Sequence, residues 1–174
     1  MRIRQGGPAD AGAVLALFDE AVEWLVARGR AAQWGSEPLS RNEKMVARVG
    51  RWAAGGGLWM AEEDGAVVGA LAVVEEPEPY IPAAGEPERY VDLLLSSRRC
   101  AGRGIGATLL RHAVALAEQA GVGLLRVDCW AGSPELIAYY ASQGFTPEGT
   151  YTINGQSGQI FERRLGHQPR TASR

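Results

Sequence analysis

Apolar and polar residues alternate along the 174-residue chain in two different periods, which together predict a domain of mixed α/β structure. Short apolar runs bounded by turn residues are typical of buried strands, and apolar residues that recur every three or four positions are typical of one helix face. Strands are expected at residues 2–4, 58–62, 67–74, 90–95, 124–130, 145–151 and 159–165. Helices are expected at residues 8–28, 42–53, 105–120 and 134–143, with Met45, Val46, Val49 and Trp52 inward on the second.

The connections between these elements predict how the strands pair. Asp64-Gly65 between two apolar runs is a strong hairpin signal, so the strands beside it should be antiparallel. A helix joins residues 90–95 to residues 124–130 in a βαβ crossover, so these two strands should be parallel. The sequence therefore predicts a mixed, mostly antiparallel sheet with one parallel step. Residues 75–87 contain four prolines, which predicts a long irregular loop, and a lid over a site is compatible with it.

The strongest candidate chemistry lies in residues 90–121. A predicted strand leads there into the turn Gly102-Arg103-Gly104-Ile105-Gly106, and a helix follows at once. Glycines let backbone N–H groups approach a phosphate closely, and the first helical turn adds unpaired donors and the positive end of the helix dipole. The pattern therefore predicts a pyrophosphate-binding site.

Two other phosphate-binding folds match parts of this pattern but not the whole chain. With Ala107 in the last position the turn fits the dinucleotide motif G-x-G-x-x-A, and Asp128 lies about twenty residues further on, where a ribose-binding acid would stand. Only residues 129–174 remain after it, which is too few for the further βαβ units of a doubly wound sheet. A Walker-type P-loop is excluded because no Gly-Lys-Ser/Thr follows the turn.

Composition narrows the expected partners. The formal charge of −2 gives no basic footprint for nucleic acid and no attraction to an anionic membrane. The two cysteines, Cys100 and Cys129, are too few for a disulfide framework and have no metal-ligand spacing around them, so no metal is expected. No apolar leader or membrane-length segment is visible, and a cytoplasmic location is the expectation.

The element order and two motifs resemble the GNAT superfamily of acyl-CoA-dependent N-acetyltransferases over nearly all of residues 2–165. The run from Ala101 to Gly106 matches the family signature Q/R-x-x-G-x-G/A, although Ala101 stands where Gln or Arg is usual. The segment Leu136-Ile137-Ala138-Tyr139-Tyr140, which leads to Gly144-Phe145, is similar to the pattern A-x-x-x-Y-x-x-x-G-F. Leu136 replaces the usual Ala, and Ser133 stands where the family often has Asn.

The resemblance implies a fold with splayed central strands and helices on both faces, and it implies a site. Tyr140, four residues before Gly144, would be the acid for the leaving thiolate, since unperturbed phenol and thiol pKa values differ by only about 1.5 units. Asp92 would be the base, with a structural pairing to an arginine as the open alternative. Weaker base candidates are Glu20, Glu23 and Glu62. The implied coenzyme-binding residues are Leu94, Leu95, Ser96, Ala101, Gly102, Arg103, Gly104, Ile105, Gly106, Ser133 and Tyr140.

The expected function is transfer of an acetyl group from acetyl-CoA, as co-substrate, to a primary amine. An acidic face on the first predicted helix mildly favours a cationic small molecule as the acceptor. A protein N-terminus or lysine as acceptor, and a non-catalytic acyl-CoA sensor, stay open as alternatives. Residues 1–165 are expected to form one acetyltransferase domain and residues 166–174 a disordered tail. A homodimer is compatible with the sequence, although no self-complementary patch can be identified.

Overall fold

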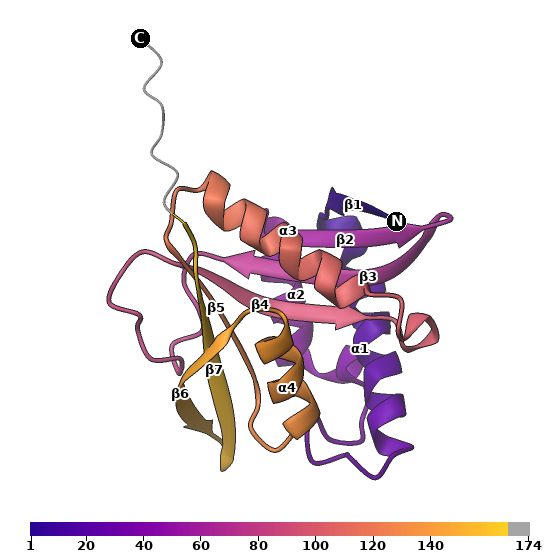
Figure 1. Ribbon diagram of the computed structural model, residues 1–174. Helices are drawn as coiled ribbons and strands as arrows, with labels where there is room; N and C mark the ends of the chain where they lie inside the picture. The colour runs from indigo at the N-terminus through magenta and orange to yellow at the C-terminus, as the bar shows by residue number, and fades with distance from the viewer. Residues whose placement is uncertain (167–174) are drawn as a thin grey trace. The chain divides into compact units, whose positions relative to one another are not determined.

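The computed structural model describes residues 1–166, and its elements follow the predicted order. Hydrogen-bonded neighbours form a seven-stranded sheet in the order β1-β2-β3-β4-β5-β7-β6 (Figure 1). The strands are β1 (Arg2–Gln5), β2 (Leu58–Glu63), β3 (Ala66–Val74), β4 (Arg89–Ser96), β5 (Leu124–Trp130), β6 (Thr146–Ile153) and β7 (Gln156–Arg164). The α-helices are α1 (Ala11–Val26), α2 (Glu43–Ala54), α3 (Ile105–Gln119) and α4 (Pro134–Ser142), with 3₁₀ turns at Pro8–Asp10, Leu39–Arg41 and Arg98–Cys100.

The strand pairing confirms the predicted mixed sheet. Strands β4 and β5 are parallel, with Tyr90 opposite Arg126, whereas β1–β2, β2–β3, β5–β7 and β6–β7 are antiparallel. The β2–β3 turn has positive φ angles of 50° at Asp64 and 79° at Gly65. Positive φ at both central residues is what a type I′ hairpin turn requires, which explains the strength of the Asp-Gly signal.

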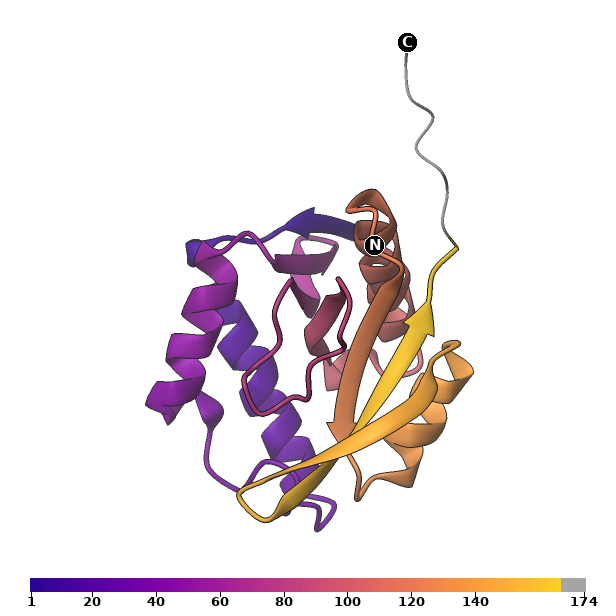
Figure 2. The ribbon, with the colours of Figure 1, turned by 90° about the vertical axis from the view of Figure 1, so that its left-hand side faces the viewer.

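The chain divides into two compact units. The first unit comprises Met1–Val74 and Asp92–Leu110, and the second comprises Glu75–Val91 and the chain from Arg111 onward. In the first unit, α1 and α2 lie side by side (Figure 2) and share one core with β2, β3 and β4. That core is made of buried apolar side chains, including Val14, Phe18, Val49, Trp52, Leu58, Met60, Ala70, Ala72 and Leu93.

The start of α3 packs on the opposite face of β3. Gly69 alternates with the core residue Ala70, so it faces away from α1 and α2. A Cβ added at Gly69 would lie 2.8 Å from Cγ2 of Ile105 and 2.9 Å from the carbonyl oxygen of Leu95. The missing side chain therefore lets the first turn of α3 approach the sheet closely, which fixes the glycine turn that precedes it.

The second unit contains β5, β7, β6 and α4 (Figure 2). Its irregular segment before β4 has no helix or strand, which confirms the predicted loop at residues 75–87. The segment is attached to β5, because the buried Arg126 guanidinium forms two hydrogen bonds with Glu88, of 2.5 and 2.7 Å, and a third with the Pro82 carbonyl at 2.9 Å. Whether its outer part moves as a lid stays a prediction.

Three details differ from the predicted pattern or lie outside it. Val46, expected inward, is 41% exposed, because Met45, Val49, Trp52 and Ala53 form the buried stripe of α2 and turn Val46 to its edge. The last hairpin is longer than predicted, since its turn is formed by Asn154 and Gly155 with φ of 50° and 75°. Of the tail predicted at residues 166–174, positions 167–174 lie outside the described residues.

Within residues 1–166, none of the helices combines the length and the apolar character that a membrane crossing requires.

Candidate functional site

The predicted phosphate turn lies in the first unit, at the end of β4. A single 3₁₀ turn at Arg98–Cys100 follows the strand, and α3 begins at Ile105. Gly102 and Gly104 have φ of 78° and 72°, a backbone conformation that residues with a Cβ rarely adopt. The backbone N–H of Thr108 donates to the Gly104 carbonyl, so the preceding N–H groups of α3 begin the helix without intrahelical acceptors. Residues 101–104 are exposed, so this turn is open to a ligand.

The side chain of Arg103 forms an ion pair with an acidic residue of a neighbouring strand. Its guanidinium is 55% exposed and forms an ion pair of 2.7 Å with Glu63 at the end of β2. The positive charge that this side chain would add to the turn is therefore partly compensated. Backbone N–H groups and the helix dipole are left as the main attraction for an anion.

Helix α1 holds the chain segment that leads into the turn. The carboxylate of Glu20 accepts hydrogen bonds from the Ser97 hydroxyl at 2.9 Å and from the Arg99 backbone N–H at 3.1 Å. One turn further along α1, the Trp24 ring lies 4.6 Å below the Arg98 guanidinium. Burial raises the pKa of Glu20, but the hydrogen bonds from Ser97 and the following backbone outweigh it, so that the pKa is lowered overall. Glu20 is thus an ionised anchor for this segment.

Asp92, the predicted base, is held by two side chains of α2 in the same unit. The Arg48 guanidinium contacts its Oδ1 at 2.5 Å, and the Trp52 indole N–H donates to its Oδ2 at 2.8 Å. The Asp92 side chain is only 7% exposed. The pairing with an arginine that the sequence left open is therefore present, and it attaches β4 to α2.

Two of the weaker base candidates on this unit, Glu20 and Glu62, also have partners. Glu62 accepts a hydrogen bond of 2.7 Å from Nε of Arg4, whose guanidinium also binds Asp10. The backbone N–H of Ser40 donates to Asp19, on the acidic face of α1. These acids hold elements together, so the acidic face is in part structural.

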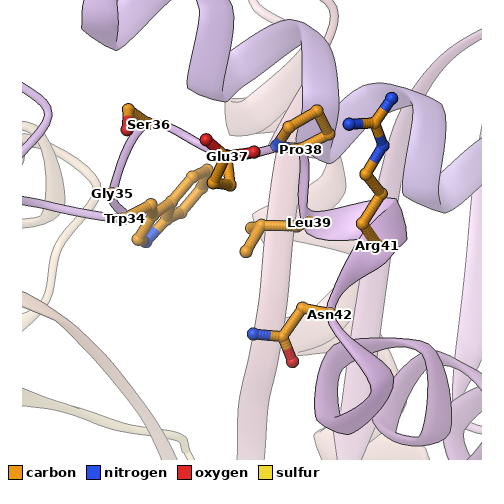
Figure 3. Close-up of a pocket in the computed structure, with 8 residues that line it drawn as sticks. All are labelled: Trp34, Gly35, Ser36, Glu37, Pro38, Leu39, Arg41 and Asn42. Atoms are coloured by element: carbon orange, nitrogen blue, oxygen red, sulfur yellow. The ribbon is translucent and has the colours of Figure 1, made fainter.

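A separate hollow of about 350 Å³ opens in the connection between α1 and α2. Figure 3 shows the side chains around it, among them Trp34, Glu37, Leu39 and Arg41. One aromatic ring, one carboxylate and one guanidinium in a space of this size could hold part of a small polar ligand.

Tyr140, the predicted acid, lies in the second unit on α4. Ser133 caps this helix, because its hydroxyl oxygen accepts a hydrogen bond from the Leu136 backbone N–H, and Pro134 follows at the first helical position. The Tyr140 ring packs against Phe145 and Phe161 and is 6% exposed. Burial, followed by the nearby Cys129 and Asp128, raises its pKa, so the phenol stays protonated at neutral pH.

The second unit also contains a polar cluster that the sequence did not predict. Asp128 on β5 accepts a hydrogen bond of 2.6 Å from the Tyr90 hydroxyl at Oδ1 and another from the Tyr151 hydroxyl at Oδ2. In the sequence, Asp128 was notable only for its distance from the glycine turn. No motif links residues 90, 128 and 151, so no local signal could have shown that they meet.

The remaining coenzyme-binding candidates occupy the expected positions in their elements. Leu94 and Ser96 on β4 are partly exposed and alternate with the buried Leu95. Ser133, the N-cap of α4, is 6% exposed. The residues from Leu94 to Gly106 belong to the first unit, and Ser133 and Tyr140 belong to the second. Among residues 1–166, no three His, Cys, Asp or Glu side chains gather in a way that could hold a metal ion.

Comparison with known proteins identifies the same family that the sequence motifs resemble. The family model "Acetyltransferase (GNAT) family" matches residues 16–145. A curated relative, "Probable glucosamine 6-phosphate N-acetyltransferase 2" of Oryza sativa subsp. japonica, is 37% identical over 60 residues. That match covers 34% of this chain and 34% of the relative, so it spans about a third of each protein.

Solved structures match over almost the whole chain. The structure of ribosomal-protein-alanine N-acetyltransferase from Brucella melitensis is 26% identical, with a TM-score of 0.67, over 95% of this chain and 100% of that one. A GNAT-family acetyltransferase from Listeria monocytogenes has 21% identity and a TM-score of 0.73 over 94% of both chains. The structure of yncA, a putative acetyltransferase from Salmonella typhimurium with its cofactor acetyl-CoA, has 18% identity and a TM-score of 0.66, over 97% of this chain and 95% of that one. The last two share the fold.

Proposed function

Because this chain belongs to the acetyltransferase (GNAT) family, we propose that it transfers an acetyl group from acetyl-CoA to the primary amine of a small molecule. We treat residues 1–165 as one acetyltransferase domain in this proposal. The observation that carries it is the exposed turn at residues 101–104, with two glycines at positive φ before a helix N-terminus. This arrangement suits the pyrophosphate of a coenzyme.

The residues of the first unit would bind the coenzyme. Backbone N–H groups of Gly102, Arg103, Gly104 and Gly106 would donate to the pyrophosphate, and the backbone at residues 94–96 would pair with the pantetheine amides. The anchor at Glu20 and the close packing at Gly69 keep this turn in one conformation before the ligand arrives. Such preorganisation lowers the entropic cost of binding.

The chemical step requires one bond to form and one to break. The acceptor nitrogen attacks the thioester carbonyl carbon, the C–S bond breaks, and the nitrogen passes one proton to solvent water. Tyr140 would donate the proton that the leaving thiolate takes up, and would regain one from solvent. The phenol carries its proton across the neutral range, but burial raises its pKa, so proton transfer to the thiolate is less favourable than the unperturbed pKa values imply.

For Asp92 we propose a positioning role instead of proton abstraction. Its two oxygens accept hydrogen bonds from the Arg48 guanidinium and the Trp52 indole N–H, so protein donors hold this carboxylate between β4 and α2. Asp92→Asn should lower stability, while the acidic limb of the pH profile of kcat should be unchanged. Loss of that limb in the variant would instead identify Asp92 as the base.

A protein N-terminal amine is a second candidate acceptor. This candidate is favoured by the structure from Brucella melitensis, which is named as a ribosomal-protein-alanine N-acetyltransferase. The match covers 100% of that chain and 95% of this one, at 26% identity. The rice relative, named for glucosamine 6-phosphate, favours an amino sugar phosphate instead, although the match covers only 34% of it. Both compounds belong in the acceptor panel.

The test begins with calorimetric titration of the protein with acetyl-CoA, with NAD as the comparison. A thiol-release assay then follows with glucosamine 6-phosphate, spermidine, n-butylamine and a peptide with an N-terminal alanine. Tyr140→Phe should lower kcat by about 10²–10⁴-fold, a much larger effect than any change in the Kd for acetyl-CoA. Tyr139→Phe, on the same helix and only partly buried, is the matched control and should keep wild-type kcat.

The outcomes separate the proposal from its rivals. If acetyl-CoA does not bind, the transferase proposal fails. If it binds but no amine yields free thiol, the chain is a coenzyme-binding sensor instead. Equal kcat values for Tyr140→Phe and wild type would exclude Tyr140 as the acid.

A further inference from the structure

An acidic side chain of the β2–β3 hairpin holds the arginine of the phosphate turn. Nη2 of Arg103 lies 2.7 Å from Oε2 of Glu63, and the two side chains are 55% and 22% exposed. Nη1 of Arg103 makes a weaker contact of 4.0 Å with Sγ of Cys100, and Oε1 of Glu63 lies 3.9 Å from the amino nitrogen of Met1. Glu63 is therefore the main partner of the Arg103 guanidinium, in a contact that solvent can reach.

The strand directs Glu63 towards the phosphate turn. Met60 of β2 points into the core shared with α1 and α2, so Glu63, three positions later, projects from the opposite face of the strand. The first turn of α3 packs on that face of the sheet, against Gly69. Glu63 is the last residue of β2 and pairs with Ala66 across the tight hairpin turn. Its backbone is therefore fixed beside the segment that leads into α3.

The same guanidinium is next to the backbone groups expected to bind a phosphate. Arg103 lies between Gly102 and Gly104, whose φ angles of 78° and 72° shape the exposed turn. An anion bound by the N–H groups of this turn would lie within reach of the Arg103 side chain, because the donors belong to the same three residues. The Glu63 carboxylate and the bound anion therefore compete for one cation.

The two contacts differ in strength. An exposed ion pair between two side chains changes an equilibrium constant by a factor of only about 1.4–5. A guanidinium and a phosphate form charge-assisted, often bidentate hydrogen bonds, which are stronger. We propose that Glu63 sets the affinity of this turn by holding Arg103, and that Arg103 changes partner from Glu63 to the pyrophosphate when the coenzyme binds. The assignment rests on the proposed function, because the pyrophosphate is that of acetyl-CoA.

Glu63 is in this assignment a positioning residue that weakens coenzyme binding. Each binding event must first separate the pair, and each dissociation event re-forms it. Differences in affinity between variants of one site lie mostly in the dissociation rate. Glu63 should therefore shorten the time for which the product CoA stays bound.

A gain of affinity on removal of one charge tests the assignment. Calorimetric titrations with acetyl-CoA and with inorganic pyrophosphate compare wild type with Glu63→Gln at about 0.15 M salt, where the Debye length is about 8 Å. Glu63→Gln should lower both Kd values about threefold or more. The matched control is Asp64→Asn, which removes the same charge one residue later and should keep both Kd values within twofold. Within residues 1–166 the Asp64 carboxylate has no ion-pair partner, and Asn tolerates its positive φ of 50°.

A second substitution tests whether the effect passes through Arg103. Arg103→Gln alone should raise the Kd for acetyl-CoA, and addition of Glu63→Gln to that variant should change it by less than twofold. A structural role for Glu63 would not produce this loss of effect. A Kd for Glu63→Gln that equals or exceeds the wild-type value would overturn the assignment. Equal tightening by Asp64→Asn, or tightening that persists without Arg103, would overturn it as well.

A measurement on wild type requires no altered glutamate. The NMR signal of the Arg103 Nε–H group, assigned by its loss in Arg103→Gln, should shift when pyrophosphate is added. If Glu63→Gln does not fold, this shift supports the exchange of partners, and an unchanged signal at saturating pyrophosphate overturns it.

The outcomes separate this assignment from the proposed function. If pyrophosphate binds more tightly to Glu63→Gln but acetyl-CoA does not bind at all, the role of Glu63 stands and the transferase fails. Acetyl-CoA binding and thiol release with equal Kd values for wild type and Glu63→Gln would do the reverse. If neither ligand binds to any variant, both are refuted.

Discussion

Replacement of Glu88 by Gln removes the negative charge that compensates the buried guanidinium of Arg126. The two side chains are 8% and 4% exposed, and they share two hydrogen bonds, so both charges are largely shielded from bulk water. The hydrogen bond from Arg126 to the Pro82 carbonyl remains but supplies no charge. Arg126 cannot lose its proton at accessible pH, so the variant must keep an uncompensated cation in the interior or open the structure around it.

The expected cost follows from this burial. Breaking a buried ion pair by removing one partner costs about 3–5 kcal/mol. For a protein of this size, 1 kcal/mol shifts Tm by about 2–4 °C, so Glu88→Gln should lower Tm by about 6–20 °C. The double variant Glu88→Leu with Arg126→Met should recover most of this loss, because apolar side chains of similar volume need no compensating charge.

Thermal unfolding followed by circular dichroism gives the measurement. The control is Glu86→Gln, the same substitution two residues earlier, in an ion pair of similar length (2.6 Å) with Arg164 at the surface. That variant should keep a Tm close to wild type, because water replaces the lost interaction. A loss below about 1 kcal/mol for Glu88→Gln, or equal effects of the two substitutions, would show that burial does not control the strength of this pair.

Three further predictions concern the phosphate turn, the packing beneath it and the response to pH. Gly104→Ala should lower the free energy of unfolding by about 1–2 kcal/mol, because φ is positive at this position. It should also raise the calorimetric Kd for acetyl-CoA at least tenfold. The control is Gly7→Ala, where φ is −149° and the space around the glycine is free, and it should change neither quantity. Gly69→Ala should lower the free energy of unfolding in urea by about 1–3 kcal/mol, since its Cβ would meet β4 and α3 within 2.9 Å; an unchanged midpoint would contradict the close approach. The pKa of Asp10 is lowered, chiefly by its hydrogen bond with Arg4, so its stabilising effect is complete above the ordinary pKa of 3.8 and is lost as the pH falls through the lower folded-state value. Asp10→Asn should therefore lower Tm at neutral pH and converge with wild type in acid, and a Tm difference that persists in acid would refute the linkage.

The sequence by itself determined the local elements and the family. Each of these local features, namely the hairpin, the helix cap and the phosphate turn, depends on residues that lie within a few positions of one another. Asp64-Gly65 requires positive φ at both positions, Ser133 caps the helix that starts beside it, and Gly102 and Gly104 set the turn before α3. These preferences are properties of the local backbone, so they are visible without knowledge of the fold. The parallel pairing of β4 with β5 could also be predicted from the sequence, because a strand–helix–strand crossover within one sheet places its two strands parallel.

Only the tertiary structure decided which polar side chains meet. Glu20 reaches Ser97, Asp92 is held by Arg48, and Asp128 lies between Tyr90 and Tyr151. The two residues of each pair lie between 23 and 77 positions apart in the sequence. Their meeting depends on strand register and on the glycines that let elements approach, neither of which has a local sequence signal. The sequence alone allows an acidic residue to be a catalytic base or a structural anchor, and its partners in the folded chain decide between the two.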